Sequence, residues 1–415
     1  MTSRERVLRA VDHKEADRVP VDFGATPSTN LSAIAYNNLK KHLGLPQGHT
    51  RVYDPVQQVI LPEGWFLDRF GIDVIDIALG WDAEDSDWKA GTLADGGEAE
   101  LPKNFDARRQ PDGSHLAYLP DGTPAGKMPA GATFFDQIIF PYLDGYPEDY
   151  ASLAQDMSRI SWSAFAHTPW NHAGEADFWP RLRERTIGLR ETTDKALLFV
   201  CGCNLFEWGT FLRRIDNFLM DLLSEPVEVE RLLDALLENH MRTLEKACEY
   251  VGDVVDIIRF GDDLGMDSGP FMSPEIYRAL FKPRHKQLCD YVKKHSKMRT
   301  FLHSCGSLYK LLPDLIEVGY DILNPIQTSA AEMDPGRLKK EFGRDIVFWG
   351  AGVDTRHILN HGTPEQVRED VRRRLEIFMP GGGFVFNAIH NIMPDCPPEN
   401  VEAMFETVEQ YGAYK

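Results

Sequence analysis

The feature that most constrains the fold of this chain is a repeated pattern: from about residue 195 onward, short apolar runs alternate with amphipathic helical stretches. Each run ends in a polar residue or a glycine, which is typical of the strand-to-helix step in a βαβ unit. The runs predict strands at 197–203, 254–262, 300–303, 321–324, 346–350 and 384–387. Apolar residues at helical spacing predict helices at 228–250, 273–293, 308–318, 364–378 and 398–411. Pro226, Pro364 and Pro398 fit helix starts, because a first-turn residue needs no amide proton.

Two earlier runs, at 18–24 and 73–79, predict the first strands, with a helix at 31–43 between them. Eight strands are then available, and right-handed crossovers between parallel strands leave two architectures, an open doubly wound sheet or a closed barrel. We favour an α/β fold of the (β/α)₈ TIM-barrel type, because nearly every predicted strand ends in a chemically useful residue and a barrel builds its site from all the strand ends. The whole chain, 1–415, is predicted to be one barrel domain.

Residues 82–168 depart from this pattern. They contain the turn sequence PDG at 111–113 and again at 120–122, with alternating short segments such as 115–119. Turn residues between alternating segments are typical of hairpins, so we expect an antiparallel β-hairpin insertion within the barrel. The aromatic and apolar residues at 134–140 argue against a disordered loop here.

The net charge and the cysteine content limit what this protein can bind and where it functions. The formal net charge of −19 argues against a sequence-independent grip on nucleic acid, which needs a basic face, and favours a small molecule or another protein. The N-terminus has charges every few residues where a signal peptide would need an apolar run, and no apolar stretch is long enough to span a bilayer. We therefore expect a cytoplasmic protein that does not bind membranes. Six cysteines are too sparse for a disulfide scaffold and are available as thiols or metal ligands.

The strongest local signal is TFLHSCGSL at 300–308, in which an apolar strand delivers His303 and Cys305 and then turns at Gly306. Side chains at i and i+2 of an extended strand point to the same side, so an imidazole and a thiolate can converge on one ion. Zinc accepts this mixed nitrogen and sulfur set. Standing alone, the pair is weak support for a metal site, since a buried cysteine usually behaves as a small hydrophobe.

A catalytic zinc site needs a third protein ligand from another strand end and leaves a fourth position for water or substrate. His390, just after the last predicted strand, is the first choice for that ligand. Cys396 could reach the ion only if its proline-flanked loop folds inward. The other candidates are Asp262, Asp263, Glu207 and Cys203.

Further polar residues at strand ends are candidates for catalysis and binding. Asp262 or Asp263 could bind a metal, orient a ligating histidine or take a proton, and the alternative role of a turn or helix cap is expected for at least one of the two. His390 is counted with them as a catalytic candidate. Three neutral side chains are expected in cofactor binding: Asn324, Gln327 and Asn387.

The glycine clusters at 350–352 and 381–383 match neither a dinucleotide fingerprint nor a Walker loop, so no nucleotide cofactor is expected. No Gly-x-Ser-x-Gly elbow occurs either, and nothing else in the sequence indicates a serine hydrolase.

Several long blocks resemble the uroporphyrinogen decarboxylase superfamily, in the branch related to corrinoid-dependent methyltransferases. They are RVPVDFG at 18–24, RFGDDLGMDSGPFMSPEIYRALFKP from 259, FLHSCGSLYKLLPDLIEVGYDILNPIQ from 301, FWGAGVDT at 348–355 and GGGFVFNAIHNIMPDCPPENV from 381. The resemblance implies a (β/α)₈ barrel. In its methyltransferase members a His-x-Cys element and a later cysteine bind zinc, which implies His303 and Cys305 as ligands here. The later cysteine is replaced by His390, with Cys396 as a less favoured substitute.

The resemblance also implies a function. Porphyrinogen decarboxylation needs an arginine-rich element after the first strand, whereas this chain has GATPSTNL at 24–31, and only Asp262 and His390 match positions that the decarboxylase uses. The implied activity is therefore methyl transfer between a small substrate, such as a methyl ether undergoing O-demethylation, and a corrinoid (cobalamin) carried by a separate protein, with zinc as cofactor. The alternatives are a decarboxylase of a porphyrinogen or a smaller acid, and a non-catalytic ligand-binding barrel. Members of the superfamily often pair as homodimers, but the sequence leaves the oligomeric state open.

Overall fold

The computed structural model describes residues 1–46 and 49–415. Its centre is a seven-stranded sheet in the order β17-β16-β15-β14-β11-β10-β3, in which all neighbours are parallel. Buried β-branched and aromatic side chains dominate these strands, as expected of a parallel sheet covered by helices. The strands are β3 (Val74–Asp76), β10 (Ala196–Gly202), β11 (Ile257–Gly261), β14 (Arg299–His303), β15 (Ile322–Asn324), β16 (Val347–Trp349) and β17 (Phe384–Val385).

An eighth segment closes the sheet into a barrel. Val21 forms a parallel bridge to Phe386, next to β17, and its carbonyl accepts the amide of Asp73, next to β3. The segment around Val21 thus lies between the two edge strands, as the sequence predicted. The (β/α)₈ architecture is confirmed, and the open-sheet alternative is excluded by this closure.

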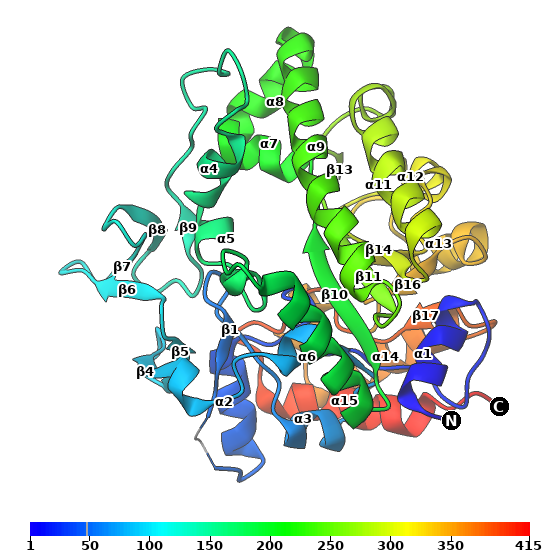
Figure 1. The fold of residues 1–415 in the computed structure, drawn as a ribbon. Coiled ribbons are helices and arrows are strands. Elements are labelled where there is room, and N and C mark those ends of the chain that lie inside the picture. The colour runs from blue at the N-terminus through cyan, green and yellow to red at the C-terminus, as the bar shows by residue number, and fades with distance from the viewer. Residues whose placement is uncertain (47–48) are drawn as a thin grey trace.

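Helices surround the barrel (Figure 1). The helices α9, α14 and α15 begin at the three prolines expected at helix starts. The helices outside the barrel strands are α1 (Ser3–Val11), α2 (Ala33–His42), α3 (Gly64–Arg69), α6 (Phe178–Thr192), α7 (Phe206–Arg213), α8 (Ile215–Ser224), α9 (Pro226–Val251), α10 (Pro274–Ile276), α11 (Lys282–His295), α12 (Leu312–Val318), α13 (Pro335–Phe342), α14 (Pro364–Phe378) and α15 (Pro398–Tyr411).

One predicted helix is interrupted. The stretch predicted as a helix at 273–293 consists of α10, a π-helical turn (Tyr277–Phe281) and α11. Pro283 lies in the first turn of α11 and has no amide proton for the carbonyl of Ala279, so the helix widens just before it. The helix predicted at 308–318 likewise starts only at Leu312, with Pro313 in its first turn.

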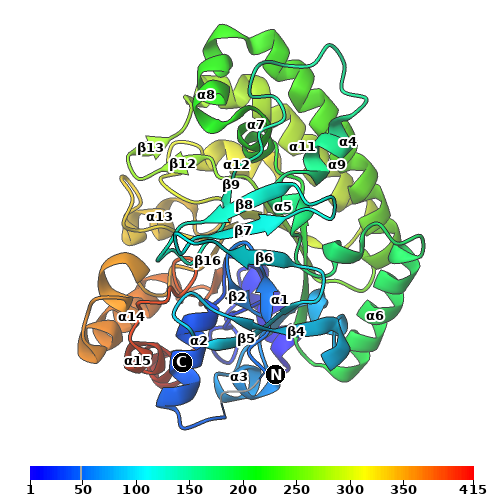
Figure 2. The ribbon, with the colours of Figure 1, turned by 90° about the vertical axis from the view of Figure 1, so that its left-hand side faces the viewer.

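Between β3 and β10 the chain forms the antiparallel strands that the turn sequences predicted (Figure 2). Gly113 and Gly122, in the two PDG turns, both have φ +84°, a conformation that glycine adopts without strain. Phe105, Phe135 and Phe165 form a small apolar core of this region. The sequence missed the hairpin β1 (Val52–Asp54) and β2 (Val59–Ile60), and it also missed the helices α1, α3, α4, α5, α6, α7, α8 and α13. The other strands and short helices of this region are β4 (Trp88–Thr92), β5 (Glu98–Pro102), β6 (Asp106–Arg109), β7 (His115–Tyr118), β8 (Pro124–Met128), β9 (Asp136–Gln137), α4 (Leu153–Ser158) and α5 (Ser161–Ala164).

No helix within residues 1–46 and 49–415 combines the length and the apolar character needed to cross a membrane.

Candidate metal centre

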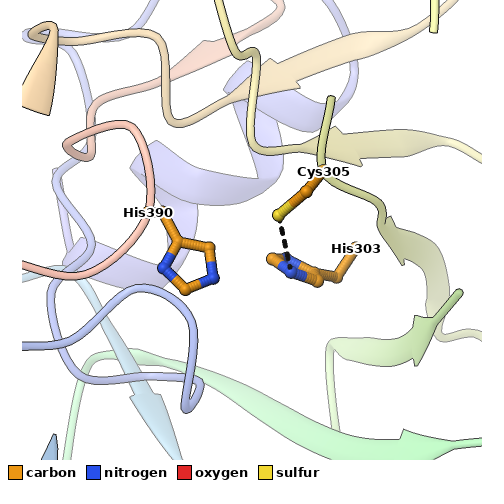
Figure 3. Close-up of side chains that lie close together, drawn as sticks. All are labelled: His303, Cys305 and His390. Carbon is orange, nitrogen blue, oxygen red and sulfur yellow. Dashed lines mark hydrogen bonds between the residues drawn. The ribbon is translucent and has the colours of Figure 1, made fainter. Parts of the chain in front are cut away.

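His303 and Cys305 lie together at the carboxyl end of β14. His303 is the last residue of the strand and is paired in register with Gly261 on one side and Asn324 on the other. The chain turns at Gly306, where φ is +88° and a Cβ atom would lie 2.3 Å from the backbone of Gly265. Only glycine permits this close passage, which holds Cys305 beside the strand end. The Nε2 atom of His303 and the Sγ atom of Cys305 are 3.6 Å apart (Figure 3).

This separation fits two ligands of one zinc ion. Zinc binds sulfur at about 2.3 Å and imidazole nitrogen at about 2.0–2.1 Å, so a tetrahedral angle places the two ligand atoms about 3.6 Å apart. The observed distance has that value.

His303 is also oriented as metal-binding histidines usually are. Its Nδ1 atom lies 2.7 Å from Oδ1 of Asn324, whose Nδ2 donates to the carbonyl of Trp349 at 3.0 Å. Since the Nδ2 contact identifies Oδ1 as the acceptor, the proton of His303 is on Nδ1 and the lone pair of Nε2 faces Cys305. A hydrogen bond of this kind from the outer ring nitrogen fixes the tautomer of a metal ligand.

His390 completes a group of three ligand atoms that all lie within 4.8 Å of one another. It comes from the loop after β17 and faces the other two from the opposite side (Figure 3). His390 has φ +66°, a backbone conformation that is uncommon for residues with a side chain and concentrates at functional sites. Its Nδ1 accepts the amide of Asn391 at 2.8 Å, which leaves Nε2 for an ion. Coordination through Nε2 would move the ring proton to Nδ1 and break that bond, so His390 is the least well prepared of the three.

The two neighbouring aspartates point in different directions. Asp263 lies at the centre: its Oδ1 accepts the amide of Cys305 at 2.8 Å and is 3.8 Å from Nε2 of His303. Asp262 is fully buried and accepts the amides of Phe206 and Glu207 at the start of α7. It also lies 3.0 Å from Nε2 of His285. Both oxygens of Asp262 thus accept amides at the start of α7, which fits the alternative role of a helix cap, and its predicted catalytic role stays a prediction.

The three amide side chains expected in cofactor binding all bond protein groups, although Oδ1 of Asn387 is buried without a hydrogen-bond partner among the described residues. Asn324 holds His303, as described above. Gln327 accepts the amide of Gly306 and donates to Asp267, both at 2.9 Å, and so braces the turn that follows Cys305. Asn387 donates to the carbonyl of Asp22 at 2.6 Å, which ties the closing segment to β17. All three thus help to position neighbouring protein groups, and their contact with a cofactor stays a prediction.

The remaining candidate ligands lie outside the group of three. Cys203 is buried with its Sγ 3.7 Å from that of Cys201, and the thiol of Cys396 donates to the carbonyl of Leu359 at 3.5 Å. Glu207 lies near Asp263 at the first turn of α7, where burial, followed by the charges of Asp263 and Asp262, raises its pKa to about 8. Glu207 therefore carries a proton at neutral pH.

Electrostatics keep the three ligand side chains uncharged. Burial lowers the pKa of His303 well below its ordinary value and that of His390 to about 4. Burial, followed by the nearby acidic groups of Asp263 and Glu207, raises the pKa of the Cys305 thiol. His303 thus offers a lone pair at pH 7, His390 would offer one after its tautomer change, and a cation that binds Cys305 would release the thiol proton.

Sequence reasoning missed a second set of polar groups in the barrel. Arg259 projects from β11, and Tyr53 donates a hydrogen bond to Asp76 at the end of β3. Burial raises the pKa values of Asp76 and of Asp22 to about 7. The available signal was a charged residue inside the apolar strand sequence IIRFG at 257–261.

The family model described as uroporphyrinogen decarboxylase (URO-D) matches residues 206–411, which contain His303, Cys305 and His390. The chain belongs to the uroporphyrinogen decarboxylase superfamily. Among curated members of the superfamily, uroporphyrinogen decarboxylase from Methylococcus capsulatus is 33% identical over 101 residues, which cover 24% of this chain and 27% of the relative. The enzyme of the same name from Chloroherpeton thalassium is 24% identical over 197 residues, covering 44% of this chain and 54% of the relative. The matched parts are thus about a quarter and about half of these relatives' lengths.

Among solved structures, a methyltransferase from Methanosarcina mazei aligns over 100% of both chains, with a TM-score of 0.57 and 17% sequence identity. This likeness supports the barrel fold across the entire chain, including the N-terminal half that the family model does not match.

Proposed function

We propose that this protein is a zinc-dependent methyltransferase that moves a methyl group between a small substrate and a corrinoid carried by a separate protein. The observation that carries the proposal is the His303–Cys305 pair, whose 3.6 Å separation and hydrogen bond to Asn324 suit a zinc ligand pair. The superfamily includes decarboxylases and methyltransferases, and decarboxylation would give such a pair no role.

Three side chains would hold the zinc ion: His303, Cys305 and His390. When bound, zinc supplies a Lewis acid that polarises a methyl ether oxygen, or it holds an acceptor thiol as thiolate. Asp263 fixes the backbone of Cys305 and keeps a carboxylate next to His303. Glu207 holds a proton near neutral pH and is the candidate general acid for a leaving oxygen.

The test uses the zinc-loaded protein with a reduced corrinoid protein and candidate methyl donors: aryl methyl ethers, methylated amines and methylated thiols. We expect the absorbance of methylcobalt to appear with at least one donor class. An unchanged corrinoid spectrum with every class would refute the proposal.

The names of the curated relatives support a second proposal, a decarboxylase that acts on a porphyrinogen or a smaller acid. The segment 24–31 has no arginine to bind the carboxylates of a porphyrinogen, which weighs against it. Cys305→Ala separates the proposals, because methyl transfer should lose both zinc and activity whereas a metal-free decarboxylase should keep its turnover. A protein that binds neither zinc nor any tested small molecule would instead be a non-catalytic barrel.

A further inference from the structure

Arg259 is a buried arginine without a direct ion pair among the described residues. Its side chain projects from β11 and the residue is only 9% exposed. Among the described residues its one hydrogen bond runs from Nη2 to Oγ of Ser28, at 3.2 Å. The Nε atom is buried without a partner, Nη1 makes no hydrogen bond, and no carboxylate oxygen of the described chain lies within 4.0 Å of the guanidinium.

The other buried arginines show that this arrangement is exceptional. Arg6 binds Asp17 and Asp73, Arg284 binds Asp234, and Arg374 binds Asp370. A buried charge without a partner is strongly destabilising, so fold stability does not explain an arginine at position 259. We therefore infer that the free N–H donors of Arg259 have a function in binding.

The guanidinium lies at the barrel mouth, close to the candidate metal centre. A Cβ atom on Gly261 would lie 3.1 Å from Nη1 of Arg259, so the side chain runs along β11 and passes over Gly261. Gly261 is the register partner of His303. Ser28, which receives the Nη2 bond, lies on the loop after the closing segment. The charge of Arg259 is also near enough to lower the pKa values of His303 and His390.

We propose that Arg259 binds a carboxylate of the small-molecule substrate, so that the methyl donor or acceptor of this enzyme is a monocarboxylate. A guanidinium suits this task because its rigid, fork-shaped donors match the two oxygens of a carboxylate. One negative charge is favoured over two, since the single cation already has the acidic group of Asp263 in its electrostatic surroundings. The proposal rests on methyl transfer as the function and adds the class of substrate.

The experiment compares carboxylates with amides of the same shape. Isothermal titration in a chloride buffer would measure binding of 4-methoxybenzoate and methoxyacetate against 4-methoxybenzamide and methoxyacetamide, with zinc-loaded protein and no corrinoid. For the unaltered protein we expect at least one carboxylate to bind about tenfold or more tighter than its amide, the gain typical of a charge-assisted hydrogen bond. Arg259→Met should abolish this preference, and Arg259→Lys should retain part of it.

Two controls keep the test decisive. Arg356→Met removes an exposed arginine that is already paired with Asp267, and it should leave the preference unchanged. Arg259→Met should fold and show an unchanged or higher Tm, because it removes an unpaired buried charge. A lower Tm with no change in carboxylate preference would assign Arg259 a structural role and overturn the proposal.

Three binding results would overturn it as well: equal affinity for carboxylates and amides, a preference that survives in Arg259→Met, or tighter binding of inorganic phosphate than of either carboxylate. A preference that depends on Arg259, combined with no methylcobalt for any donor, would leave the carboxylate site standing and refute methyl transfer. Methylcobalt formed only from uncharged donors would support methyl transfer and refute the carboxylate site.

Discussion

The hydrogen bond from His303 to Asn324 should control the affinity for zinc. The bond is 2.7 Å long and both residues are buried, so Asn324→Leu leaves the Nδ1 proton of His303 without an acceptor. An unsatisfied buried donor costs about 1–3 kcal/mol. The ring can avoid that cost only by moving its proton to Nε2, which removes the lone pair that an ion needs. Either way zinc binding weakens, by about 10–100-fold.

Asn324→Asp is the matched variant. It keeps an acceptor oxygen for His303 but replaces Nδ2, which donates to the carbonyl of Trp349, with a second acceptor oxygen. A carboxylate in that position makes the imidazole a stronger ligand, so the affinity should equal or exceed that of the unaltered protein. Asn400→Leu is the control for a general loss of stability, since Asn400 is equally buried but bonds the carbonyls of Leu359 and Gly362.

Competition with a chromophoric zinc chelator measures the three affinities, and circular dichroism checks that the variants fold. The reasoning fails if Asn324→Leu binds zinc within about twofold of the unaltered protein, given the 10–100-fold loss expected. It also fails if Asn324→Asp loses as much affinity as Asn324→Leu, because the acceptor oxygen would then be irrelevant.

Cys305→Ala should abolish stoichiometric zinc while Cys396→Ala retains it, as measured by elemental analysis; zinc lost equally from both would place the ion elsewhere. His390→Cys should bind zinc more tightly than His390→Ala, since a thiolate restores the third ligand that alanine lacks, and equal affinities would remove position 390 from the site. Burial raises the pKa of Asp22 from an ordinary 3.8 to about 7, so the folded protein holds this proton more tightly than the unfolded chain. The resulting stability is full below pH about 4 and is lost as the pH rises through about 7, on the order of 4 kcal/mol. In Asp22→Asn, which keeps an oxygen for the indole of Trp349, urea unfolding should depend less on pH in this window; an unchanged profile would contradict the raised pKa.

The positions of the barrel strands could be predicted from the sequence, because the alternation of apolar runs and helical stretches is a local pattern. Each predicted barrel strand overlaps an observed one or, around Val21, a bridge that closes the barrel. The widened turn before Pro283 was not predicted, although its cause is local, because apolar spacing continues across it. The helix boundaries elsewhere differ by a few residues where fraying and capping decide them.

The candidate site was readable only in part, because much of it depends on partners far apart in sequence. The i, i+2 spacing places His303 and Cys305 on one side, and the structure brings His390 to them across the barrel. Two adjacent aspartates at a strand end must point to different sides, but the sequence does not say that Asp263 is the one at the centre. Arg259 was missed because its lack of a direct ion pair is visible only in the folded chain, where its hydrogen-bond partner, Ser28, lies 231 positions away in the sequence.

The closure at Val21 has a consequence for how the protein matures on the ribosome. The partner of this segment, Phe386, follows all the other barrel strands along the chain, so one side of the first strand stays unpaired until those strands have been synthesised. Contacts between such distant residues form slowly and leave sheet edges exposed to aggregation. His390 follows Phe386 by only four positions, so the third candidate ligand is synthesised directly after the last strand of the barrel. Zinc supplied during translation would therefore select chains that have already closed.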